Sequence, residues 1–145
     1  MLKQPPFPED ESDHAARMYL SGDNLIVKLN AVALANFRWS LWWLATTCPC
    51  GEDIGIWAEE QPEQHQDPEE IGYCEITLAG EGPVFGKLHN PNAEFLHRDE
   101  RIDLFVNRSQ VEVSCQSLEA FSGTVIGQNV LLFGRLLVRV AGTRG

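Results

Sequence analysis

The segment from Leu25 to Trp43 places an apolar residue at every odd position. The even positions between them include five polar side chains: Lys28, Asn30, Asn36, Arg38 and Ser40. A period of two is typical of a strand with one face buried and the other in water. Phenylalanine and tryptophan also favour the pleated surface of a sheet. The pattern therefore predicts that short strands build the core, and that residues 37–45 form one of them.

A helical pattern runs through the same segment. Leu34, Phe37, Leu41 and Leu44 recur at helical spacing, and Asn30 stands where a residue would cap a helix over the alanine-rich residues 31–46. Two fold classes therefore stay open. One is mainly β, an antiparallel sandwich or small barrel of about seven to eight strands. The other is α+β, with one helix at about 31–46 packed on an antiparallel sheet.

Further strand signals, separated by turn residues, run along the rest of the chain. Strands are expected at residues 24–29, 56–58, 71–79, 84–89 and 129–140, the last with a bend at Gly134. Residues 102–113 are interpreted as a hairpin, with Asn107, Arg108 and Ser109 in its turn. Residues 90–100 are expected to form a connection, which could include one helical turn, and residues 14–20 either a helical turn or the start of a strand.

The negative charge of the chain is concentrated in one window. The formal net charge is −10, yet no lysine or arginine occurs between Arg38 and Lys87. The acids of this window are Glu52, Asp53, Glu59, Glu60, Glu63, Asp67, Glu69, Glu70, Glu75 and Glu81. Such a region speaks against nucleic-acid binding, which needs cations to neutralise phosphates. It favours a basic protein partner, because complementary charge accelerates encounter.

Tryptophan adds an anchor to this hypothesis. If residues 37–45 form a strand, Trp39 and Trp43 face the core, and Trp42 alone turns outward. An exposed tryptophan is typical of interface hot spots. The predicted partner-binding residues are Trp42, Glu52, Asp53, Glu59, Glu60, Glu63, Asp67, Glu69 and Glu70. They indicate a non-enzymatic binding protein, of the kind that immunity or inhibitor proteins exemplify. A carbohydrate-binding module and a structural subunit of a larger assembly are the alternatives without catalysis.

The cysteines indicate an enzymatic alternative, a metal-dependent or cysteine-based hydrolase. Cys48 and Cys50, with His65, are the candidate zinc ligands or nucleophiles. A single stiff proline between the cysteines is shorter than the usual two to four residues of zinc sites, and no second pair follows. Acidic surroundings would also raise the pKa of either thiol and disfavour the nucleophilic thiolate. No cofactor is therefore predicted.

Composition also predicts the domain plan. Residues 1–13 hold three prolines and four acids and are expected to form a disordered arm, while residues 14–145 form a single domain. The longest strongly apolar stretch, Leu41–Ala45, is far shorter than the roughly 18 residues of a membrane span. No membrane contact is expected, and a cytoplasmic location with reduced thiols is the prediction.

Overall fold

The computed structural model describes residues 2–8, 14–58, 70–80, 94–98, 101–121 and 126–141. Among these residues strands predominate, at 45% against 28% helix, and they form two mixed sheets accompanied by two helices. The sheets do not close into a barrel. The predicted predominance of strands is thus confirmed, whereas the sheets are mixed rather than purely antiparallel.

Sheet A contains five strands in the order β4-β1-β2-β9-β8. Their bounds are Ala16–Ser21 for β1, Asn24–Leu29 for β2, Glu70–Ile71 for β4, Asn129–Leu132 for β8 and Leu136–Val140 for β9. The β2–β9 pair is parallel, and the other pairs are antiparallel.

Sheet B contains four strands in the order β3-β5-β7-β6. Their bounds are Asp53–Trp57 for β3, Tyr73–Gly80 for β5, Glu94–Arg98 for β6 and Arg101–Asn107 for β7. Here the β5–β7 pair is parallel, and the other two pairs are antiparallel.

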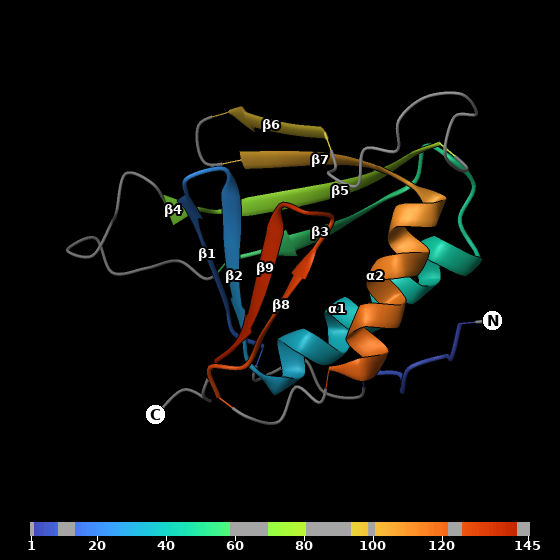
Figure 1. Ribbon diagram of the computed structural model, residues 1–145, viewed down its shortest axis with the longest axis horizontal. Coiled ribbons are helices and arrows are strands. Elements are labelled where there is room, and N and C mark those ends of the chain that lie inside the picture. Colours follow the sequence, from blue (N-terminus) through green and yellow to red (C-terminus); the bar gives the residue numbers. More distant parts are fainter. Residues whose placement is uncertain are drawn as a thin grey trace.

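The two sheets share one core. Figure 1 shows sheet A crossing in front of sheet B, with both helices at one end of the pair. Alternate residues of each sheet are buried there, such as Leu25 and Val27 on β2 and Ile76 and Leu78 on β5. The opposite residues form an outer face on each sheet, so the two outer faces point away from each other.

Helix α1 (Ala31–Thr46) resolves the ambiguity of the first segment in favour of the helical alternative. The predicted strand at 37–45 is therefore wrong. Asn30 caps the helix, because its Oδ1 accepts hydrogen bonds from the N–H groups of Ala33 (2.9 Å) and Ala15 (3.2 Å). The helical period turns Trp43 outward, where it is 36% exposed, and leaves Trp42 half-buried.

Helix α2 (Arg108–Ala120) replaces the second arm of the predicted hairpin. Asn107 lies at its N-cap and not in a hairpin turn. The Asn107 side chain accepts from the Gln110 N–H, and the Gln110 side chain accepts from the Asn107 N–H, each at 2.8 Å. This reciprocal capping box satisfies two backbone donors that the first helical turn leaves without partners. The buried residues Val111, Cys115 and Leu118 follow the helical period.

Other sequence predictions meet mixed outcomes. Residues 14–20 contribute to β1, residues 94–98 form β6 and not a plain connection, and residues 129–140 form two strands around a turn. Gly134 lies in that turn with a φ of 67°, a backbone conformation that glycine adopts without strain. The strand expected at 84–89 lies outside the described residues.

Arg108 joins the start of α2 to the end of α1. Its Nη1 donates to the carbonyl oxygens of Leu44 (3.3 Å) and Ala45 (2.9 Å), and its Nη2 donates to that of Cys48 (2.7 Å). The last carbonyls of a helix have no partner within the helix, and they carry partial negative charge. One guanidinium therefore terminates α1 and fixes the two helices relative to each other.

Replacing Asn30 with alanine is expected to lower the free energy of unfolding by about 1–2 kcal/mol, because two backbone donors lose their acceptor at a buried position. Urea denaturation followed by circular dichroism measures this change. Asn30→Asp keeps the accepting oxygen and should lose less stability. An equal loss in both variants would contradict the capping role.

Candidate functional site

The outer face of sheet B carries an ordered row of large side chains. Cross-strand register places Trp57 of β3 opposite Tyr73 of β5, Tyr73 opposite Arg101 of β7, and Arg101 opposite Arg98 of β6. We call these four residues the aromatic–arginine row. Side chains opposite each other on one face of a sheet are close enough to interact. The row therefore crosses the whole sheet as one continuous surface.

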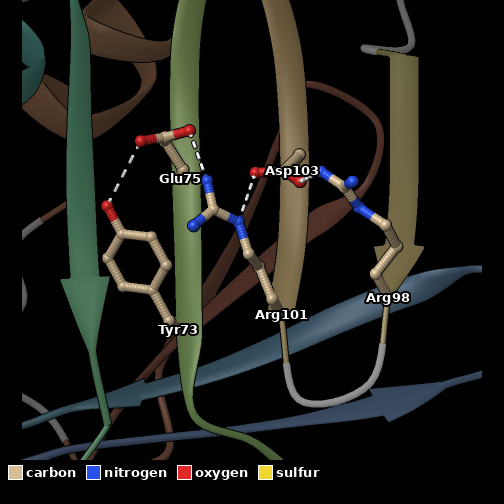
Figure 2. Close-up of polar contacts among 5 residues, drawn as sticks. All are labelled: Tyr73, Glu75, Arg98, Arg101 and Asp103. Carbon is tan, nitrogen blue, oxygen red and sulfur yellow. Dashed lines mark hydrogen bonds and ion pairs between the residues drawn. The ribbon is translucent and has the colours of Figure 1, made fainter.

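Carboxylates hold the two arginines in place, as Figure 2 shows. Arg101 donates from Nε to Asp103 (2.9 Å) and from Nη2 to Glu75 (2.6 Å), and Arg98 donates from Nη2 to Asp103 (3.1 Å). Asp103 is only 2% exposed although it lies on the outer face. A buried carboxylate needs such partners, and here the two guanidinium groups supply them.

Tyr73 is positioned by a glycine. Its ring lies over Gly55, where an added Cβ would stand 2.5 Å from the Tyr73 oxygen. The hydroxyl donates to Glu75 (3.5 Å), and Arg101 lies 5.0 Å from the ring centre. Burial raises the pKa of Tyr73, and the negative charges of Glu75 and Asp53 raise it further.

Trp57 is largely exposed, although its ring stacks on that of Tyr73. Its ring centre lies 4.2 Å from that of Tyr73, yet 68% of the residue is exposed. Because Tyr73 is itself fixed by Glu75 and Gly55, the indole rests on a rigid support. Sequence reasoning did not select Trp57, although the signal was present: Ile54 and Ile56 are the inward residues of β3, so Asp53, Gly55 and Trp57 must face outward.

The predicted acidic residues fall into three groups. Glu52 and Asp53 are exposed at the start of β3 and, within the described part of the chain, make no ion pair. Glu70 pairs with Arg17 of β1 at 3.4 Å. The other predicted acids, Glu59, Glu60, Glu63, Asp67 and Glu69, lie outside the described residues. Glu52 and Asp53 are thus the acids that the structure brings to the outer face of sheet B and its rim.

Trp42 lies elsewhere, between the helices. It lines a pocket of about 160 Å³ formed by residues 3–6, α1 and α2, and none of the described window acids lines that pocket. The N-terminal segment is fixed there by the Lys3 N–H, which donates to Glu119 at 2.8 Å, and by Phe7 against Trp39 at 4.9 Å. Residues 9–13 of the expected arm are outside the described residues.

The two candidate cysteines differ in their exposure to solvent. Cys48 is buried and Cys50 exposed, while His65 lies in the part of the chain that the structure does not describe. The pKa of Cys48 is raised, first by burial and then by the charge of Glu52, which disfavours the nucleophilic thiolate. The described ranges contain no group of three or more histidine, cysteine or acidic side chains placed to hold a metal ion.

Comparisons of the chain with family models, with curated proteins and with solved structures gave no match. Among the described helices, none combines the length and the apolar composition that crossing a bilayer requires. Functional inference therefore depends on the geometry of the outer face of sheet B.

Proposed function

We propose that this protein is a non-enzymatic binding domain, and that the outer face of sheet B recognises a basic protein partner. One observation supports this most directly: Trp57 is largely exposed, yet it stacks on a Tyr73 ring that neighbouring side chains hold in place. Tryptophan, tyrosine and arginine are the residues that dominate binding energy at protein interfaces. All three types meet in the aromatic–arginine row.

The charge around Trp57 favours a cationic partner. Asp53 lies four residues before Trp57 on the same face of β3, and Glu52 adjoins Asp53. An exposed indole on a face that also carries a carboxylate suits a partner with several arginine or lysine side chains, because the ring quadrupole and the carboxylate both attract cations. The charges of Arg98 and Arg101 are offset by Asp103 and Glu75. The net charge of −10 steers such a partner from a distance.

Rigidity supports recognition as well. Ordering a flexible side chain on binding opposes association by about 0.5–1.5 kcal/mol. Tyr73 is already ordered by Glu75 and Gly55, and Trp57 by Tyr73. Fast, preorganised capture of a basic surface is the requirement of an immunity or inhibitor protein. The four cysteines are free thiols, which fits the cytoplasmic location we propose.

A fluorescein-labelled deca-arginine peptide provides a probe of this face. Trp57→Ala is expected to weaken its binding at least tenfold, in line with the loss of a hot-spot tryptophan. Trp43→Ala, which removes another exposed tryptophan from α1, should leave the affinity unchanged. Fluorescence anisotropy measures both affinities.

The salt dependence of the on-rate completes this test. Stopped-flow association should slow as the salt concentration rises from 50 to 500 mM, on the order of tenfold or more, because salt screens the steering charges. Equal affinities of the two tryptophan variants, or an on-rate that salt does not change, would refute the proposed function.

A further inference from the structure

The described N-terminal segment lies against the two helices and joins neither sheet, as Figure 1 shows. We call its residues 3–8, with the sequence KQPPFP, the strap. Every residue from Gln4 to Pro8 is a proline or directly precedes one. Proline restricts its own φ and disfavours the helical region for the residue before it, so such a sequence favours an extended polyproline conformation. The strap is therefore stiff and extended before it contacts anything.

Both ends of the strap contact the helix pair. The N–H of Lys3 donates to a carboxylate oxygen of Glu119 on α2 at 2.8 Å. The ring of Phe7 meets the ring of Trp39 on α1 edge to face, with 4.9 Å between the ring centres. One end of the strap is thus held by an acidic side chain and the other by an aromatic ring.

The prolines between these contacts share a pocket with a tryptophan. Pro5 and Pro6 line the pocket of about 160 Å³ together with Trp42 of α1. The ring centre of Trp42 lies 5.1 Å from that of Trp39, so the prolines and the phenylalanine of the strap meet one aromatic pair. Proline-rich ligands dock on aromatic-lined surfaces in this way, because their extended backbone is already ordered before binding. The helix pair therefore carries the features of a surface that binds proline-rich segments.

The strap is only loosely held on this surface. Phe7 is 65% exposed, and Lys3 and Pro6 are exposed as well. Within the described residues one hydrogen bond joins the strap to the helices, and its three prolines have no N–H with which to form others. The strap lines the pocket with the helices but does not fill it. Leu2 packs against the core just before the strap, so residues 3–8 can leave the helices while the chain around them stays folded.

We propose that the surface around Trp39, Trp42 and Glu119 binds a proline-rich segment of a partner protein, and that the strap occupies this surface in the absence of the partner. The partner segment makes the same kinds of contact, with prolines beside Trp42, an aromatic ring on Trp39 and a backbone N–H on Glu119. Its side chains gain affinity over the strap where they reach further into the pocket and bury more apolar surface. The net charge of −10 favours a segment with a lysine or arginine beside its prolines, as the strap has in Lys3. This surface shares no residue with the outer face of sheet B, so the inference is independent of the proposed function.

Binding of the peptide LKQPPFP, labelled with fluorescein at its C-terminus, to the full chain tests this inference by fluorescence anisotropy. In the parent the strap competes with the peptide, and a strap that is bound nine-tenths of the time lowers the apparent affinity about tenfold. A strap variant with Pro5→Gly, Pro6→Gly and Phe7→Ala should therefore bind the peptide about tenfold more tightly than the parent. The substituted residues lie outside the helices and sheets, so circular dichroism of the strap variant should match that of the parent.

Two controls show whether the peptide uses the proposed surface. In the strap variant, the further change Trp39→Ala should weaken peptide binding about tenfold, whereas Trp57→Ala on the outer face of sheet B should leave it unchanged. A peptide of equal charge in which alanine replaces the three prolines should bind about tenfold more weakly, because its flexible backbone must be ordered on binding. Equal binding of the two peptides, equal affinities of the parent and the strap variant, or a strap variant that does not fold would overturn the inference.

Discussion

Raising the pH from 9 to 11 is expected to reduce the free energy of unfolding by about 5 kcal/mol through two cysteine thiols alone. Burial raises the pKa of Cys74 to about 12, and the charges of Asp103 and Glu75 add to the shift. Burial likewise raises the pKa of Cys115 to about 12, followed by Glu119 and Glu112. Both thiols must stay protonated in the folded state.

The sign of this effect follows from the raised pKa values. Below pH 9 the thiols are protonated in the folded and the unfolded chain, so the full stability is present. As the pH rises from 9 towards 12, the unfolded thiols ionise first, and each disfavours folding by up to about 1.4 kcal/mol per pH unit. Because single domains have a total stability of about 5–15 kcal/mol, alkaline unfolding should set in within this range.

Urea denaturation between pH 7 and 11 measures the effect. A double variant, Cys74→Ala with Cys115→Ala, should be less stable at pH 7 because it leaves two small cavities, but its stability should fall less steeply above pH 9. Cys50→Ala removes an exposed thiol and should follow the parent curve. A double variant whose stability falls in parallel with the parent would show that the buried thiols do not control alkaline stability.

Replacing Arg108 with methionine is expected to lower the free energy of unfolding by about 3 kcal/mol. The change removes every donor that this guanidinium gives to the carbonyls of Leu44, Ala45 and Cys48, while methionine retains most of the aliphatic volume. A partly buried carbonyl that loses its hydrogen bond is destabilised by about 1–3 kcal/mol, and water at the helix end recovers part of this. The last turn of α1 should fray, and the packing of α1 on α2 should loosen.

Denaturation of two arginine variants isolates this contribution. Arg139→Met makes the same chemical change on the outer face of sheet A, where no backbone carbonyl is capped among the described contacts, and should alter stability by less than about 0.5 kcal/mol. Arg108→Lys should fall between the parent and Arg108→Met, since an ammonium can reach some of the three acceptors. Equal losses in the two methionine variants would contradict the capping role of Arg108.

The parts of the fold that could be predicted from the sequence are those in which the apolar residues fit the period of a strand or that of a helix, but not both. Strands β2 and β5 alternate cleanly, and their inward residues are buried as expected. In α1 the apolar residues satisfy both periods, and the competing tryptophan propensity pointed to a strand. Tertiary packing decides such a case: α1 buries its Leu34–Phe37–Leu41–Leu44 stripe, and α2 packs against it.

Helix α2 carried a signal that went unused. Asn107 and Gln110 have the spacing of a capping box, and Val111, Cys115 and Leu118 have helical spacing. The alternation of Val111 and Val113 suggested a strand. Two apolar residues are too few to distinguish the period of a strand from that of a helix. Strand β6 could not be predicted, since it is a short edge strand defined by its pairing with β7.

The candidate site could be predicted in its charge but not in its geometry. The acidic window was visible, yet the pairing of Glu70 with Arg17 and of Glu75 with Arg101 joins strands distant in sequence. Only the register of the sheets reveals that such acids are neutralised. The same register brings Trp57 onto Tyr73, which shifts the binding hypothesis from Trp42 to the edge of sheet B.

The parallel pairing of β2 with β9 determines when the domain can become complete during synthesis. Leu25 pairs with Leu136, so sheet A cannot be completed until residues 136–140 have left the ribosome. The β1–β2 hairpin can form early, but the backbone edge of β2 that pairs with β9 must stay unpaired until β9 has been made. Such non-local pairing slows folding and prolongs the exposure of apolar surface. This nascent hairpin is therefore where a holding chaperone would act.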